Sequence, residues 1–137
     1  MLRNLKKHGA GIKDLLDVYI KQCRCVLELA APVWSAGITV AESKQIERVQ
    51  KAAFSIILGN SYVSYEQALA ELKMDTLEER RKSLCIKFAK TSQKHPKFSN
   101  WFELSDDPIE NKFKPVTYRT KRYKNSPLPY LTSLLNE

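Results

Sequence analysis

The stretch "IERVQKAAFSIILG" (residues 46–59) has the spacing of an amphipathic helix, yet it places a glutamine on the apolar side. At 100° per residue, Gln50 lies in the middle of a narrow apolar stripe formed by Ile46, Val49, Ala53 and Ile57. A buried amide without a partner costs on the order of 1–3 kcal/mol. Either Gln50 has a hydrogen-bond partner in the interior or this helix does not face the core, and we expect the partner.

Both ends of this helix carry local signals. It begins at "TVAES", where Thr39 and Glu42 have the spacing of a capping box, in which each side chain accepts a hydrogen bond from the other residue's backbone amide. Gly59 can adopt the left-handed conformation that ends many helices. The pattern therefore predicts a helix from this cap to Gly59.

Two more helices are expected on either side of this one. The first runs from about Ile12 to Ala31, and Pro32 stops or kinks it because proline has no amide hydrogen. A shorter helix starts at "SYEQALAEL", where Ser64 and Gln67 again have capping-box spacing. No stretch of residues 1–95 alternates in polarity, so no sheet is expected there.

A fourth helix is predicted from about Leu77 to Lys94. Asp75 or Thr76 caps its start, and His95-Pro96 marks its end because the residue before a proline is disfavoured in a helix. Its apolar stripe also contains a polar side chain, as in the glutamine helix.

That side chain is Arg81, which shares a stripe with Leu77, Leu84 and Phe88. In one interpretation its stem lies across the core edge and its charged head reaches water. In the other, Arg81 links the two long helices by donating to Glu47, to Gln50 or to a backbone carbonyl, a role that suits a guanidinium. Such links mainly fix the register of packed helices. Gln50, Arg81 and Glu47 are therefore a candidate structural polar network.

The chain changes in character after residue 95. Residues 112–136 contain six basic residues and no acidic one, and Pro115, Pro127 and Pro129 favour an extended segment. The final "LPYLTSLLNE" is compatible with one apolar turn that docks on the helices. We therefore predict an all-α fold, a bundle of about four helices in residues 1–95 with an extended basic C-terminal tail in residues 96–137.

Composition restricts the cellular setting. The 137 residues carry a net charge of +8, with 23 basic and 15 acidic side chains, which favours polyanionic partners and nucleic acid above all. No apolar run approaches the roughly 18 residues of a membrane span, and no signal peptide is expected. The chain has three cysteines (Cys23, Cys25 and Cys85), an odd number, and Cys23 and Cys25 on one helix point apart and suit neither each other nor a shared zinc ion. The cysteines therefore indicate an intracellular protein, cytoplasmic or nuclear.

The sequence contains few residue patterns that are typical of catalytic or metal-binding sites. His8 and His95 lack a cysteine or carboxylate at ligand spacing, and Asp106-Asp107 precedes a proline in what is predicted to be a surface turn. No glycine-rich phosphate loop or nucleophile motif is present. We expect no metal, no cofactor and no enzymatic activity of the isolated chain, since a standalone enzyme would need a cluster assembled from distant residues.

Two groups of cations predict contact with nucleic acid. On the fourth helix, cations recur at intervals of one and two turns, and the segment "YRTKRYK" (residues 118–124) alternates basic and aromatic side chains. Cations contact phosphates and aromatic rings stack on exposed bases. The candidate residues are Arg80, Lys87, Lys90, Lys94, Arg119, Lys121, Arg122 and Lys124. Taken alone, each group also fits a solvated helix face or a disordered tail.

Five blocks in order carry a family resemblance: "VYIKQCRCVLELAAPVWSAGIT", "IERVQKAAFSIILG", "SYEQAL", "TLEERRKSLCIKF" and "RTKRYKNSPLPYLTSLLN". Together they resemble the C-terminal part, from the thumb onward, of a jockey-like reverse transcriptase of non-LTR retrotransposons. The chain differs at Leu29, where the family commonly has tyrosine, and it lacks the metal-binding aspartates and the Tyr-x-Asp-Asp motif of the catalytic palm.

The resemblance implies a function without catalysis. It implies a fragment of an RNA-directed DNA polymerase whose helices lie beside a template–primer duplex, with the palm domain as a possible protein partner. The alternative is a helical protein-interaction module that packs on a palm domain or self-associates through an exposed apolar patch. No membrane partner is expected.

Overall fold

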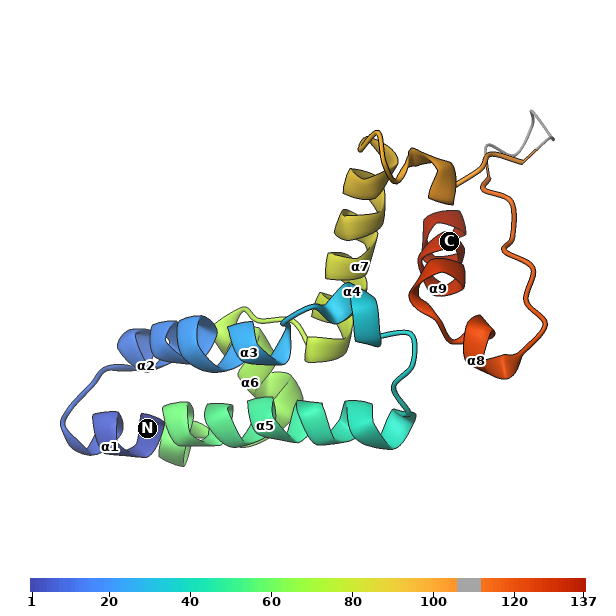
Figure 1. Cartoon of the computed structure of the whole chain (residues 1–137). Coiled ribbons are helices and arrows are strands. Elements are labelled where there is room, and N and C mark those ends of the chain that lie inside the picture. The colour runs from blue at the N-terminus through green and yellow to red at the C-terminus, as the bar shows by residue number, and fades with distance from the viewer. Residues whose placement is uncertain (106–111) are drawn as a thin grey trace. The chain divides into compact units, whose positions relative to one another are not determined.

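The computed structural model describes residues 1–105 and 112–137, and its regular secondary structure is helical (Figure 1). Five helices of this part have seven residues or more, and the only β-type pairing among the described residues is an isolated bridge between Leu104 and Phe113. The predicted all-α class is therefore confirmed. No helix in these two ranges is both long enough and apolar enough to cross a bilayer.

The chain forms two compact units. Unit 1 consists of Met1–Leu29 and Thr39–Glu79, and unit 2 consists of Ala30–Ile38 and Arg80–Glu137. The boundary predicted between residues 95 and 96 falls inside unit 2. Each unit has its own apolar cluster, so each is described by itself.

Helix α5 (Val40–Leu58) is the longest element of unit 1. The amide of Glu42 donates to Thr39 Oγ1 at 3.2 Å and the Thr39 amide donates to the Glu42 carboxylate at 2.7 Å, which confirms the capping box. The Thr39 hydroxyl donates to the same carboxylate at 2.9 Å, and the hydrogen bonds from the Thr39 amide and hydroxyl lower the pKa of Glu42. Gly59 follows with φ +59° and ψ −119°, a positive φ that favours glycine but is not the left-handed helical conformation.

A helical segment with one wide turn packs beside α5 (Figure 1). It consists of α2 (Ile12–Val18), a π-helical turn (Tyr19–Arg24) and α3 (Cys25–Leu27). A π turn holds about one residue more than an α turn, so side chains after it are rotated relative to those before it. Val26 is accordingly 67% exposed although α-helical spacing aligns it with buried Leu15.

The predicted end of this segment at Ala31 is wrong. The helix ends at Leu27, the backbone turns at Ala30 with φ +52°, and α4 (Ala31–Trp34) begins directly afterwards. Pro32 lies in the first turn of α4, where a missing amide hydrogen costs nothing because amides of the first turn have no helical acceptor. The proline therefore starts a helix here and does not end one.

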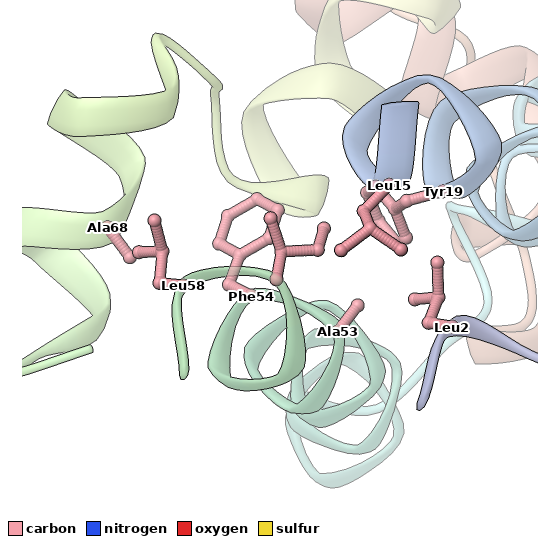
Figure 2. Packing of buried hydrophobic residues seen from close by; sticks show 8 residues of the cluster. Leu2, Leu15, Tyr19, Ala53, Phe54, Leu58 and Ala68 are labelled. Atoms are coloured by element: carbon pink, nitrogen blue, oxygen red, sulfur yellow. The ribbon is translucent and has the colours of Figure 1, made fainter. Parts of the chain in front are cut away.

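The core of unit 1 lies between α5, α1 (Leu2–Lys7), α2 and α6 (Tyr65–Leu72). Figure 2 shows how its side chains interdigitate. The buried apolar residues are Leu2, Leu15, Tyr19, Ala53, Phe54, Ile57, Leu58 and Ala68. The predicted stripe is wrong at Val49, which is 45% exposed, because α5 is rotated to bury the larger ring of Phe54.

Helix α7 (Leu77–Gln93) begins in unit 1 and continues into unit 2. Its cap is Thr76, whose hydroxyl accepts from the Glu79 amide at 3.2 Å while the Glu79 carboxylate accepts from the Thr76 amide at 3.1 Å. The predicted stripe is wrong at Phe88, which is 41% exposed, and Leu84 is half-buried. The buried positions are instead Leu77, Arg81, Cys85, Ala89 and Ser92.

The second cluster forms where α7 meets the C-terminal helix α9 (Pro127–Asn136). Small residues of α7, Cys85 and Ala89, lie against Leu131 and Leu134. The side chain of Asn136 also holds the backbone of Phe113 through two hydrogen bonds of 2.8 and 3.0 Å.

The sequence predicts an extended tail with one apolar turn at its end. The structure differs, because the tail contains the short helix α8 (Lys121–Lys124) and the longer helix α9. Pro127 and Pro129 are compatible with a ten-residue helix because both lie in its first turn. Pro115 lies in non-helical backbone, as predicted.

Candidate nucleic-acid interface

Three lysines at the C-terminal end of α7 line one surface hollow. Lys87 and Lys90 lie three residues apart on one face of the helix, Lys94 directly follows its last residue, Gln93, and all three are exposed. The hollow has a volume of about 410 Å³ and is completed by Ser83, Ile86 and Thr91. The structure therefore brings together three of the four cations predicted on this helix.

No ion pair engages these lysines among residues 1–105 and 112–137. Lys82, one turn earlier, behaves differently because it pairs with Glu137, which raises its pKa. Within the described part of the chain, the lysines of the hollow therefore present positive charge that no acidic side chain neutralises in an ion pair. Arg80, the fourth predicted cation, is half-buried and does not line the hollow.

The cations of the tail lie around α8. Arg119, Lys121, Arg122 and Lys124 are all exposed. Thr120 caps α8 by accepting the Tyr123 amide at 3.2 Å, and Lys124 Nζ lies 5.5 Å from the centroid of the Tyr118 ring. The alternating segment thus ends in a short helix, and its aromatic and basic side chains are exposed together.

Gln50 has three hydrogen bonds in the interior of unit 1, where it is fully buried. Its Oε1 accepts from the Tyr19 hydroxyl at 2.7 Å, and its Nε2 donates to the Tyr65 hydroxyl at 2.8 Å and to the Asp75 carbonyl at 2.9 Å. The glutamine therefore joins the π-helical turn, α5, α6 and the segment before α7. This arrangement satisfies the buried amide.

Glu47 extends this network by one turn of α5. Its Oε1 accepts a short hydrogen bond from the Tyr65 hydroxyl and another, of 3.1 Å, from the Leu77 amide at the start of α7. Burial raises the pKa of Tyr19 and of Tyr65 far above the ordinary value, and the bond to Glu47 raises that of Tyr65 further. Both phenols therefore stay protonated donors at neutral pH.

Arg81 lies in unit 2 and is 5% exposed, so the interpretation that its head reaches water does not hold. Its guanidinium carbon is 5.8 Å from the centroid of the Trp34 ring, a cation–π distance. The tryptophan of α4 was not among the expected neighbours of Arg81. Tyr19 and Tyr65 were likewise missed, although a tyrosine on an apolar helix face commonly needs a partner for its hydroxyl.

The sequence also singles out two histidines, an acidic pair and three cysteines. His95 Nδ1 accepts from the Lys97 amide at 3.2 Å, and the part of the chain that the structure describes holds no group of three metal-ligating side chains. Asp106-Asp107 lies outside the described residues. Cys23 is half-buried, Cys25 is exposed and Cys85 is buried, each as a free thiol.

Comparisons with known proteins give no relative. No family model, no curated protein and no solved structure matches the chain.

Proposed function

We propose that the chain is a noncatalytic C-terminal part of a retroelement RNA-directed DNA polymerase, and that α7 holds a template–primer duplex by its phosphates. The resemblance of five sequence blocks to the thumb and downstream region supports the polymerase origin. The observation that supports the contact is the exposed hollow lined by Lys87, Lys90 and Lys94. The role is noncatalytic because the sequence has no Tyr-x-Asp-Asp motif.

The spacing of the lysines suits a polyanion. At 1.5 Å per residue, Lys87 lies about 9 Å along α7 from its last residue, Gln93, and Lys94 follows directly, so the lysines span several phosphates of a duplex. Their ammonium groups attract phosphates without reading bases, so the affinity is salt-dependent and largely independent of sequence. The exposed cations Arg119, Lys121, Arg122 and Lys124 add to the positive field of unit 2.

A charge-reversal pair tests this proposal. In Lys87→Glu/Lys94→Glu, duplex binding weakens and the slope of log K against log salt becomes shallower by about 2 units, because each phosphate contact contributes about 0.9. The matched control is Lys44→Glu/Arg48→Glu, which reverses two exposed cations of α5 and changes the net charge equally. Equal effects of the two pairs, or an unchanged slope in both, contradict a contact at α7.

A second candidate function is a helical protein-interaction module, supported by an apolar hollow of about 450 Å³ in unit 1. Val49, one of the residues that line this hollow, is 45% exposed although it lies on α5 next to the core. The hollow is lined by Met1, Leu2, Arg3, Asn4, Cys23, Val49, Ala52, Ala53 and Ile56.

Size-exclusion chromatography at low and high salt separates the two functions. A dimer that persists at high salt and is lost in Val49→Asp supports the module, because apolar contacts are insensitive to screening. A monomer whose elution shifts when duplex is added supports the contact at α7.

A further inference from the structure

Two tyrosines, one before α8 and one within it, leave their rings exposed around a common hollow. Tyr118 is 49% exposed and Tyr123 is 42% exposed, and neither belongs to an apolar cluster. The hollow between them has a volume of about 440 Å³, within the range of small-ligand sites. Its other lining residues are Thr117, Arg119 and Thr120.

Local hydrogen bonds hold this segment in place. Thr120 caps α8 through the Tyr123 amide, and the Ser126 amide donates to the Tyr123 carbonyl at 3.0 Å. Lys124 Nζ lies 5.5 Å from the Tyr118 ring centroid but does not line the hollow between the tyrosines. One face of the Tyr118 ring is thus covered by a cation, while the ring still borders the open hollow.

The charged side chains of residues 112–136 all have one sign, and Glu137, which lines a second hollow with Tyr118 and Lys124, is paired with Lys82. Arg119, Lys121, Arg122 and Lys124 are exposed within six residues of one another, and the sequence has no acidic residue from 112 to 136. Rings of tyrosine offer stacking surfaces to bases, and neighbouring arginines pair with phosphates. An acidic peptide would use the cations alone and leave the rings without a role.

From this juxtaposition we infer that residues 117–124 bind unpaired nucleotides, with bases stacked on Tyr118 and Tyr123 and phosphates held by Arg119 and Arg122. A duplex does not fit this mode because its bases are already stacked on one another. The inference rests on the proposed function for its partner class, nucleic acid. It adds a second surface, specific for single strands, to the duplex contact of α7.

Fluorescence anisotropy with the full chain tests the inference. The probes are a labelled twelve-nucleotide pyrimidine strand and a blunt duplex of equal length, in the same buffer. Tyr118→Leu/Tyr123→Leu is expected to weaken binding of the single strand at least tenfold and to leave duplex binding within twofold. Tyr118→Phe/Tyr123→Phe, which keeps the rings, is the matched control and is expected to bind like the original chain.

Failure of the inference is distinct from failure of the proposed function. The single-strand site is overturned when the leucine and phenylalanine pairs bind the strand equally, or when the leucine pair loses strand and duplex to the same extent. It is also overturned when poly-glutamate competes with the strand as well as unlabelled strand does. The α7 contact is judged separately by Lys87→Glu/Lys94→Glu on the duplex, and circular dichroism confirms that each variant is folded.

Discussion

The hydroxyl of Tyr19 donates a 2.7 Å hydrogen bond to Oε1 of Gln50, and both side chains are fully buried. The tyrosine belongs to the π-helical turn and the glutamine to α5, so this bond fixes the two segments against each other. The 5.7 Å edge-to-face contact of the Tyr19 and Phe54 rings lies beside it. A polar bond inside an apolar core selects one alignment of the helices, because a shifted register leaves both groups unpaired.

Replacing Gln50 with leucine is expected to lower the free energy of unfolding by about 2–4 kcal/mol. The substitution leaves the Tyr19 hydroxyl and the Asp75 carbonyl without their partner, and each such buried group costs about 1–3 kcal/mol. Urea unfolding followed by circular dichroism measures the change. Gln45→Leu, at an exposed position of α5, is the control and is expected to stay within about 0.5 kcal/mol. Equal stability of the two variants rules out a structural role for the Gln50 network.

Alkaline pH is expected to destabilise unit 1 through Tyr19. Burial holds the pKa of this phenol well above 10 in the folded chain, whereas the unfolded chain loses the proton near pH 10. The stabilising contribution is therefore complete below pH 10 and is lost as the pH rises beyond it, at up to about 1.4 kcal/mol per pH unit. Urea unfolding between pH 8 and 11 measures the decline. It is expected to be shallower in Tyr19→Phe, and identical slopes would contradict the assignment.

The thiols of Cys25 and Cys85 are expected to react at very different rates. Cys25 is exposed, while Cys85 is buried and its pKa is raised by burial, so little of the reactive thiolate forms at neutral pH. Titration with a coloured disulfide reagent is expected to label Cys25 first and Cys85 only as the chain opens. Cys25→Ser removes the fast phase. A fast phase that persists in this variant at full amplitude would place the reactive thiol elsewhere.

Lys6 is expected to stabilise the C-terminal end of α5. Its Nζ donates to the carbonyls of Ile56 and Ile57 at 2.6 and 3.1 Å, where the helix has unpaired acceptors and the negative end of its dipole. Lys6→Met keeps the aliphatic stem and is expected to lower stability by about 0.5–1 kcal/mol in urea unfolding. Lys7→Met, which removes the exposed neighbouring charge, serves as the comparison, and a loss of equal size in both would assign the effect to net charge.

Local signals in the sequence predict much of the fold because caps act over three or four residues. The start of α5 at Thr39, the start of α6 at Ser64 and the burial of Gln50 all follow from neighbouring residues. Pro127 and Pro129 predict an extended segment but lie in the first turn of α9, because composition does not tell the first turn of a helix from a loop. The partners of Gln50 and Arg81 come from distant elements, and no local pattern identifies them.

The candidate interface was predictable only in part. Helical spacing predicts Lys87, Lys90 and Lys94 on one helix face, and all three are exposed around one hollow although α7 ends at Gln93. The same spacing included Arg80, which is half-buried, because the burial of a helix face depends on what packs against it. The exposure of Tyr118 and the hollow beside it depend on the fold of the tail, which the sequence pattern did not predict.

The π-helical turn at Tyr19–Arg24 acts like a one-residue insertion in the middle of a helix. Every side chain after it is out of phase by about 100° with an uninterrupted α-helix. Leu27 is therefore half-buried while Val26 faces solvent, the reverse of what periodicity across the turn predicts. Deleting one residue within the turn would restore an ordinary α turn and leave both side chains where they are. Closing the π turn without a deletion would instead rotate Val26 toward the core and Leu27 toward solvent, so the length of this turn matters as much as its composition.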